Sequence, residues 1–183
     1  MNLANKLTVL RVVMIPFFVG FMLMDTSVGY LIALAIFCIA SLTDLLDGKI
    51  ARKYNMVTNF GKFMDPLADK LLVSAAMVCL VETKSLASWI VIVIISREFI
   101  ISGFRLIASD NGVVIAASYW GKFKPVFQMA MIIMLILEMA IKVGEIYCII
   151  RNVVVWISVI LTVVSLIDYL IKNKSVLSEK SDK

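Results

Sequence analysis

The sequence predicts an all-α, polytopic membrane protein with six transmembrane helices and both termini in the cytoplasm. Hydrophobic residues make up 62% of the 183-residue chain, and charged residues only 17%. A soluble domain is closer to half apolar and about a quarter charged. The apolar residues also gather into separate stretches, and the basic residues concentrate in alternate connections between them. These observations favour a bilayer as the solvent of this chain.

Six apolar stretches approach the roughly 20 residues that a helix needs to cross a bilayer. They cover residues 7–24, 29–46, 67–81, 86–107, 125–141 and 146–171. The third is short unless its helix extends back through Phe63 and Met64. No repeat or low-complexity linker separates the stretches, so we expect one transmembrane domain over residues 1–171. The polar residues 172–183 are expected to form a cytoplasmic tail.

The first stretch shares one feature with a secretory signal peptide, because Lys6 lies just before its apolar run. No small-residue cleavage site follows at residues 21–25. Arg11 also lies inside the apolar pattern rather than before it. We therefore expect a retained helix.

The distribution of Lys and Arg residues orients the helices. With the N-terminus inside, the inner segments carry Lys6, Arg11, Lys49, Arg52, Lys53, Lys62, Arg105, Lys122, Lys124, Lys172, Lys174, Lys180 and Lys183. The outer segments carry Lys84, Lys142 and Arg151. This asymmetry predicts a multi-pass protein of the cell membrane whose termini are cytoplasmic. Because the basic residues flank apolar stretches instead of gathering on one helix, no nucleic-acid partner is expected.

The chain contains no histidine, which excludes Ser-His-Asp and Cys-His nucleophilic sites. Its three cysteines, Cys38, Cys79 and Cys148, are far apart in the sequence and form no CxxC pair. Any metal ion must therefore be held by carboxylates, which favours hard cations such as Mg²⁺ or Mn²⁺.

Two pairs of aspartates lie on either side of the connection between the second and third apolar stretches. Asp44 and Asp47 are spaced i, i+3, and Asp65 and Asp69 are spaced i, i+4, so each pair shares a face if its segment is helical. Small residues continue both stripes: Gly48, Ala51 and Gly61. A solvated charge at a helix end explains one such aspartate, but it does not explain the set.

Four carboxylates at the edge of the apolar zone would repel one another unless divalent cations neutralise them. The small residues leave space for a flat or phosphorylated ligand, and Arg52 suits a phosphate oxygen. The pattern therefore predicts a site for a metal-bound polyphosphate. Pro66 leaves the start of the third helix open, since the helix either begins near Asp65 or starts earlier and kinks.

The pattern Asp44-x2-Asp47-Gly48-x2-Ala51-Arg52-x8-Gly61-x3-Asp65-x3-Asp69 matches the signature of the CDP-alcohol phosphotransferase family at all eight fixed positions. With each residue type at roughly 6% usage, a chance match is on the order of 10⁻¹⁰ per starting point. The resemblance implies a six-helix membrane fold, usually dimeric, in which residues 1–171 form the catalytic domain.

The same resemblance implies the roles of the matched residues. Two divalent cations, Mg²⁺ or Mn²⁺, would be bound by Asp44, Asp47, Asp65 and Asp69. Asp69 would also accept the proton of the attacking hydroxyl. The cytidine would lie against Gly48, Ala51 and Gly61, and the diphosphate against Arg52.

Three further segments are similar to the bacterial phosphatidylglycerophosphate synthases of this family. They read Asn5-x-Leu7-Thr8-x-x-Arg11, Ser96-Arg97-Glu98-Phe99 with Ser102-Gly103-x-Arg105, and Gly121-Lys122-x-Lys124. The similarity implies transfer of a phosphatidyl group from CDP-diacylglycerol to glycerol-3-phosphate. It also implies that membrane lipids surround the protein. CDP-diacylglycerol would then also contact Asn5, Thr8 and Arg11.

Arg97, Glu98 and Arg105 are costly within an apolar stretch, which makes them functional candidates. Arg105 and Arg97, with Lys122 and Lys124, are expected to bind the phosphate of the acceptor. Two alternatives remain open. Glu98 and Arg105 are seven residues apart and share a helix face, so they could form a structural ion pair. The two lysines could simply mark the cytoplasmic flank.

The family's basic turn commonly continues with threonine, whereas here Lys124 is followed by Pro125, which the first turn of a helix tolerates. Two other functions also remain open. One is a sister enzyme on the same scaffold, such as a cardiolipin or phosphatidylserine synthase. The other is a cation transporter, although transporter sites usually lie near the bilayer midplane.

Overall fold

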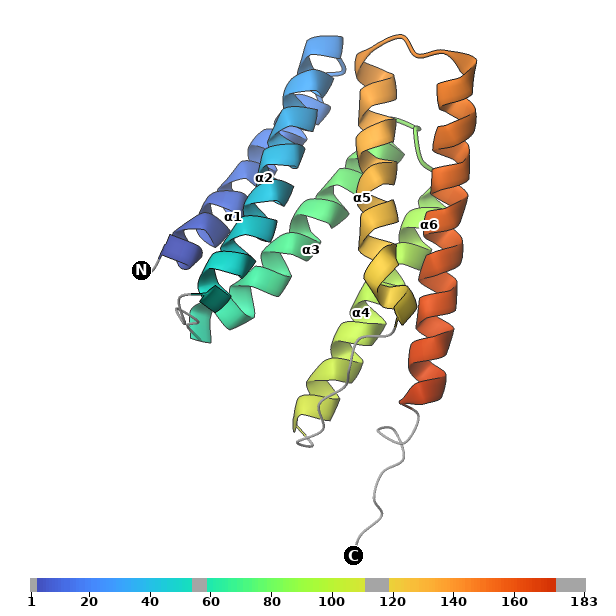
Figure 1. Cartoon of the computed structure of the whole chain (residues 1–183). Helices are drawn as coiled ribbons and strands as arrows, with labels where there is room; N and C mark the ends of the chain where they lie inside the picture. The colour runs from blue at the N-terminus through green and yellow to red at the C-terminus, as the bar shows by residue number, and fades with distance from the viewer. Residues whose placement is uncertain (1–2, 54–58, 111–118, 174–183) are drawn as a thin grey trace, which may run out of the picture. The chain divides into compact units, whose positions relative to one another are not determined.

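The computed structural model describes the backbone of residues 3–53, 59–110 and 119–173, and the side chains of residues 7–43, 67–108, 120–121 and 123–173. The regular secondary structure of this part of the chain is entirely helical, with short connections and no strand (Figure 1). Its six helices are α1 (Leu3–Met22), α2 (Ser27–Lys53), α3 (Asn59–Glu82), α4 (Ser88–Asp110), α5 (Tyr119–Ala140) and α6 (Glu145–Lys172). The predicted all-helical fold is therefore confirmed.

Two helices extend well beyond the apolar stretches that predicted them. α2 continues through the polar residues up to Lys53, and α3 begins at Asn59, before Phe63 and Met64. Hydropathy reports how much of a helix lies in lipid, but a helix continues wherever its backbone hydrogen bonds are maintained. All four aspartates therefore lie within helices.

The helices form two compact units. Unit 1 comprises Met1–Leu86 and Ile132–Gly144, and unit 2 comprises Ala87–Met131 and Glu145–Lys183. α5 contributes its first half to unit 2 and its second half to unit 1. Its second half is anchored within unit 1, where the Ser85 hydroxyl donates to the sulfur of Met139 at 3.1 Å.

In unit 1, α1 lies against both α2 and α3. The rings of Phe18 and Phe37 meet at a centroid distance of 5.9 Å in the core between α1 and α2. The buried face of α3 carries Ala68, Leu72 and Ala76 at helical spacing. Small side chains let helix backbones approach closely. In a bilayer the hydrophobic effect does not drive helices together, so this close van der Waals packing is what stabilises their association.

The turn from α1 to α2 is closed by a helix cap. The hydroxyl of Thr26 accepts a hydrogen bond from the backbone N–H of Gly29 at 3.1 Å, which satisfies one of the free donors at the start of α2. Asp25 adopts a left-handed backbone with φ of 51°, and its carboxylate accepts a bond from the Tyr30 hydroxyl at 2.5 Å. Side-chain bonds thus fix the entry angle of α2.

Gly29→Ala is expected to destabilise this turn. A Cβ at Gly29 would lie 2.7 Å from the carbonyl oxygen of Phe21 and 2.9 Å from the hydroxyl of Thr26, and the carbonyl is backbone that cannot rotate away. Overpacking of this kind costs about 1–3 kcal/mol. Thermal unfolding of the purified protein measures the effect, with Gly20→Ala as the control because nothing lies within 4 Å of its position. Equal melting temperatures for the two variants would contradict the expectation.

In unit 2, α4 lies against α6. The ring of Phe104 meets Tyr169 edge-on, with centroids 6.0 Å apart and planes inclined by 82°. Trp89 and Trp156 pair in the same unit at 6.0 Å. The buried face of α6 is polar for a helix of this kind, because it consists of Val155, Ser158, Val159, Thr162, Ser165 and Tyr169.

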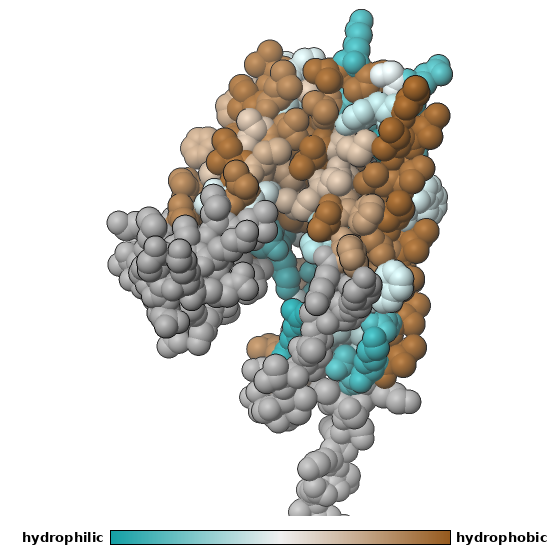
Figure 2. Space-filling view, in the orientation of Figure 1, coloured by the Kyte–Doolittle hydropathy of each residue, from teal (hydrophilic) through white to brown (hydrophobic). Residues whose placement is uncertain are grey.

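Large apolar side chains are exposed on the helices and appear brown in Figure 2. Leu106 is 74% exposed and Ile146 75%, and many others exceed one third. Soluble proteins rarely expose so much apolar surface, so these helices indicate a membrane protein. By length and composition, two helical segments of the described chain could cross a membrane, Phe123–Ala140 and Glu145–Lys172. α6 also has Glu145 in its first turn and Lys172 in its last, which complements its dipole.

Candidate active site

The predicted carboxylate site is carried by α2 and α3 of unit 1. Asp44 and Asp47 lie in α2, and Asp65 and Asp69 lie in α3, so each pair has the helical spacing that places it on one face. Of these four side chains the structure describes Asp69, which is exposed and has a polar interaction. The other predicted residues of this site lie outside the described side chains: Asp44, Asp47, Asp65, Gly48, Ala51, Arg52 and Gly61.

The start of α3 resolves the question raised by Pro66. Because α3 begins at Asn59, the helix starts well before Asp65, and the alternative of a helix that begins near Asp65 is wrong. The third helix therefore presents Asp65 and Asp69 from consecutive turns of one helix rather than from a helix start.

Two of the three α1 residues predicted to contact CDP-diacylglycerol are deeply buried. Thr8 is 0% exposed and Arg11 is 1% exposed, and each has at least one interaction partner. Asn5 lies one turn earlier on α1, with its side chain outside the described part. A buried arginine is costly unless an anionic or polar partner compensates it, so the burial of Arg11 favours a functional or structural charge pair over a simple flanking charge.

A second cluster of charges lies in unit 2, and it is centred on Glu98 of α4. The Glu98 carboxylate accepts a hydrogen bond from Arg97 at 3.2 Å and another from the ammonium group of Lys124 on α5. The Nε of Arg97 donates to the hydroxyl of Ser165 on α6 at 3.2 Å. Three helices therefore contribute to one network, which we call the Glu98 cluster: Arg97, Glu98, Lys124 and Ser165.

The Glu98 cluster is largely removed from solvent. Lys124 is 2% exposed, Ser165 is 0% exposed and Arg97 is 9% exposed. Two cations share one carboxylate, so these groups together carry a positive charge within a buried region. Buried charges persist only when they are paired or when they serve a ligand. The flanking role considered for Lys124 does not fit a side chain that is buried and paired with α4.

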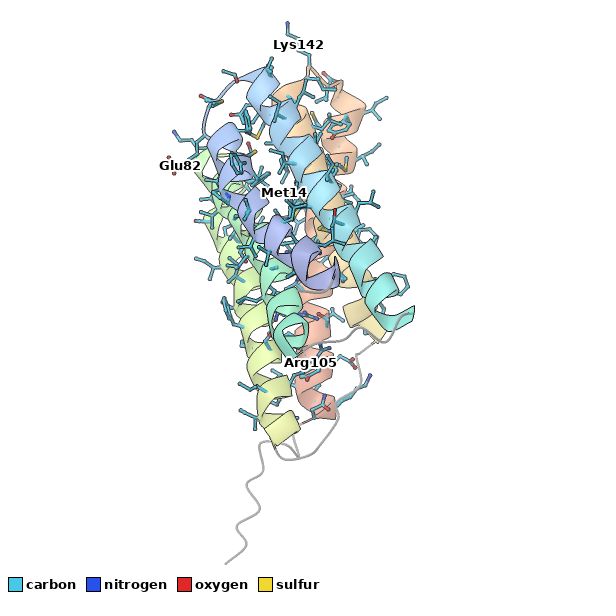
Figure 3. The ribbon with its side chains drawn as sticks, turned by 90° about the vertical axis from the view of Figure 1, so that its left-hand side faces the viewer. Met14, Glu82, Arg105 and Lys142 are labelled. Atoms are coloured by element: carbon cyan, nitrogen blue, oxygen red, sulfur yellow. The ribbon has the colours of Figure 1, made fainter. Side chains whose placement is uncertain are left out.

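Arg105 takes a different position from the one that its spacing suggested. Among the described side chains, Glu98 pairs with Arg97 and Lys124 rather than with Arg105. Arg105 (labelled in Figure 3) is exposed, yet it lies close enough to Arg97 to act on it electrostatically. The structural Glu98–Arg105 pair is therefore absent from this network. The side chain of Lys122 lies outside the described part.

Pro125 lies inside α5, which begins at Tyr119, and not in the first turn of that helix as the apolar stretch suggested. A proline inside a helix lacks the N–H that would bond the carbonyl four residues earlier, here Gly121. Lys124, next to it, points its ammonium group at Glu98. The basic segment is therefore part of the helix, and Lys124 is positioned by α5 rather than by a loop.

The donor set of this chain fits hard cations and anionic ligands. Among the residues whose side chains are described, no group of three histidine, cysteine, aspartate or glutamate side chains could hold a metal ion. Cys38 is exposed, Cys79 is buried and Cys148 is half-buried, and all three are free thiols. Of the four aspartates that the sequence predicts as metal ligands, only Asp69 belongs to the described side chains.

The sequence pattern did not single out the polar residues of α6. Ser158, Thr162, Ser165 and Tyr169 recur at helical spacing in a strongly apolar helix, and all four are buried. That periodicity was the feature of the sequence from which these residues could have been identified. Its meaning depends on the packing of α6 against α4, which brings Ser165 to Arg97.

The fold and these residues define a helical membrane protein whose unit 1 carries paired aspartates and whose unit 2 carries a buried cationic cluster. Comparison with known proteins identifies the class. The family model for CDP-alcohol phosphatidyltransferase matches residues 1–164. The chain belongs to this family, and it is an enzyme.

Several curated relatives are similar over nearly the whole chain. A CDP-diacylglycerol–glycerol-3-phosphate 3-phosphatidyltransferase of Bacillus subtilis is 44% identical over 94% of this chain and 95% of its own length. The protein of the same name from Haemophilus influenzae is 41% identical over 92% of this chain and 91% of its own. A probable phosphatidylglycerophosphate synthase of Mycobacterium tuberculosis is 37% identical over 92% of this chain and 79% of its own.

Proposed function

We propose that this enzyme transfers the phosphatidyl group of CDP-diacylglycerol to glycerol-3-phosphate, giving phosphatidylglycerophosphate and CMP. The main support is the match to relatives named for this reaction, at up to 44% identity over 94% of the chain. The Glu98 cluster adds a physical argument. A buried cluster with two cations and one carboxylate suits a phosphorylated acceptor, whereas a neutral acceptor such as serine has no use for the excess charge.

The residues proposed to hold two divalent cations are Asp44, Asp47, Asp65 and Asp69. Their carboxylate oxygens are the ligands that Mg²⁺ and Mn²⁺ prefer, and the chain has no histidine to compete with them. The helical spacing of each pair supports a shared site. When bound, the cations would supply charge neutralisation for the diphosphate and for the departing CMP.

Asp69 is proposed to take the proton from the attacking hydroxyl of glycerol-3-phosphate. Its side chain is exposed on α3, so a substrate can approach it, and a carboxylate within hydrogen-bond reach is sufficient as a general base. The attacking oxygen then forms a bond to the β-phosphorus of CDP-diacylglycerol, and the bond to the CMP oxygen breaks.

CDP-diacylglycerol is proposed to bind in unit 1. The residues assigned to it are Asn5, Thr8, Arg11, Gly48, Ala51, Arg52 and Gly61. The small residues leave room for the cytidine, and Arg52 is placed on the same helix as Asp44 and Asp47. The whole set belongs to unit 1, as do the four aspartates.

The acceptor's phosphate is proposed to bind in unit 2, through Arg97, Arg105, Lys122 and Lys124. Arg97 is held from two sides by Glu98 and Ser165, and among the described residues its remaining guanidinium N–H groups are left for a ligand. Arg105 is exposed near Arg97 and can meet an anion arriving from solvent.

We further propose that all six helices span the membrane as one catalytic domain over residues 1–171, with a polar cytoplasmic tail from 172 to 183 and an active site on the cytoplasmic side. A homodimer is the expected assembly. The excess of basic residues in the inner connections supports this orientation, and the apolar helix surfaces support contact with lipid.

The acceptor assay decides between this function and its sister reactions. Purified protein is given CDP-diacylglycerol with radiolabelled glycerol-3-phosphate, serine or phosphatidylglycerol in parallel. We expect a lipid product with glycerol-3-phosphate alone. A product with serine or phosphatidylglycerol instead would assign the chain to another reaction of the family. Absence of any product together with cation uptake into vesicles would favour transport.

Topology is tested by labelling single cysteines in intact cells, in a background where Cys38, Cys79 and Cys148 are replaced by serine. A cysteine introduced at Lys142, in the exposed turn after α5, should be labelled by an impermeant reagent added outside. A cysteine at Asn173, just after α6, should be labelled only after the membrane is opened. Labelling of both from the same side would overturn the six-span topology.

Arg105→Ala is expected to raise the KM for glycerol-3-phosphate with little effect on the KM for CDP-diacylglycerol. Loss of one charge-assisted contact of about 1.5–3 kcal/mol corresponds to roughly 10- to 150-fold in kcat/KM. Lys172→Ala is the matched control in the same unit, because the Lys172 side chain is 62% exposed and its ion pair with Asp168 lies at the surface. An unchanged acceptor KM in Arg105→Ala would remove Arg105 from the acceptor site.

A further inference from the structure

Two buried hydroxyls of α6, those of Ser158 and Tyr169, have no hydrogen-bond partner in the described part of the chain. Tyr169 is 2% exposed, and its Oη makes no hydrogen bond there. A buried hydroxyl that loses its water partners without gaining another is unfavourable, so such groups are rare in folded proteins and call for an explanation.

Two neighbouring hydroxyls on the same face of α6, those of Thr162 and Ser165, are satisfied within their own helix. Thr162 donates to the carbonyl of Ser158 at 2.7 Å, and Ser165 donates to the carbonyl of Thr162 at 3.0 Å. Short side chains can fold back in this way. The hydroxyl of a tyrosine stands at the far end of a rigid ring and cannot reach the backbone of its own turn.

The ring of Tyr169 is held in place by packing. It meets Phe104 edge-on at 6.0 Å and joins Ile101 in a buried apolar cluster, with Leu166 and Leu170 packed around it. Rotation of the side chain toward solvent would give up these contacts. The packing between α4 and α6 therefore fixes the direction of the hydroxyl.

The surroundings of this hydroxyl are cationic. Tyr169 is close enough to Arg97 for an electrostatic interaction, and Arg105 acts on the same guanidinium. Arg97 and Lys124 both contact the carboxylate of Glu98, so two of the three charged side chains that define the Glu98 cluster are cations. An O–H donor beside excess positive charge is complementary to an anion that offers several acceptor oxygens, as a phosphate monoester does.

We infer that Tyr169 is a specificity-determining residue for the acceptor, and that its hydroxyl donates a hydrogen bond to a phosphate oxygen of glycerol-3-phosphate beside Arg97. This inference rests on the proposed function. It adds to the basic residues a neutral donor whose position is fixed by α6. Ser165 and Glu98 would then orient Arg97, and Tyr169 would complete the set of donors around the phosphate.

The test compares Tyr169→Phe with the unsubstituted enzyme in detergent. We expect the KM for glycerol-3-phosphate to rise on the order of 10-fold, with kcat and the KM for CDP-diacylglycerol little changed, because one hydrogen bond to a charged group is lost. Ser158→Ala is the matched control. Ser158 is also buried on α6 with a hydroxyl that bonds no described residue, and it lies about two helical turns before Ser165, the residue that contacts Arg97.

Thermal unfolding separates this role from a structural one. Removing a hydroxyl that has no protein partner should leave the melting temperature unchanged or raise it, while the KM rises. A lower melting temperature with an unchanged KM would identify Tyr169 as a structural residue and overturn the inference.

Direct binding distinguishes failure of this inference from failure of the proposed function. Calorimetric titration of the unsubstituted protein and of Tyr169→Phe uses glycerol-3-phosphate and, separately, inorganic phosphate. If the unsubstituted enzyme makes phosphatidylglycerophosphate but Tyr169→Phe keeps its KM and its phosphate affinity, the inference alone is wrong. If the unsubstituted protein makes no such product, yet Tyr169→Phe binds phosphate more weakly, the proposed acceptor is wrong and Tyr169 remains an anion contact.

Discussion

Replacing Asp69 by asparagine is expected to lower kcat by at least about 100-fold while leaving the fold intact. Asparagine has nearly the same size and shape, but it cannot accept the proton of the attacking hydroxyl and is a poorer ligand for a divalent cation. Asp69 is exposed on α3, so the substitution leaves no buried cavity. Initial rates at saturating concentrations of both substrates measure the effect, and thermal unfolding checks the fold.

Glu82→Gln is the matched control for this substitution. Glu82 (labelled in Figure 3) is an exposed carboxylate in the last turn of the same helix, outside the proposed site, and the change removes the same charge. Its kcat should stay within about twofold, as surface substitutions away from a site are usually near neutral. If Asp69→Asn keeps its kcat, the base must be another group, and the proposed role of Asp69 is wrong.

Chelation with excess EDTA is expected to abolish turnover, and added Mg²⁺ or Mn²⁺ is expected to restore it. The physical reason is the donor set, since four aspartates at helical spacing are available and histidine is absent from the chain. Oxygen ligands hold hard cations reversibly, so activity should return with the cation instead of requiring refolding. Initial rates before chelation, after chelation and after readdition measure the effect.

EDTA saturated beforehand with Mg²⁺ is the control, because it separates removal of the cation from any effect of the chelator on the detergent-solubilised protein. It should leave the rate unchanged. Full activity in excess free EDTA would contradict the proposed carboxylate site, whatever the outcome for Asp69→Asn.

The helical class and the six helices of the described residues followed from the sequence because both depend on local properties. A stretch of apolar residues long enough to cross a bilayer must satisfy its backbone hydrogen bonds within itself, and a helix does this. The paired aspartates were also predictable. Their spacing needs only a helical backbone to bring Asp44 to Asp47 and Asp65 to Asp69, and α2 and α3 provide it. The family signature lies within this short segment.

The partners of Glu98 could not be predicted in this way. Sequence spacing offered Arg105 as its ion-pair partner, but the structure pairs it with Arg97 and with Lys124 from another helix. Residue spacing states which side chains share a face of one helix, whereas the rotation and packing of neighbouring helices determine which charges meet across them. For the same reason the sequence did not single out Tyr169, which interacts electrostatically with Arg97 because α6 packs against α4.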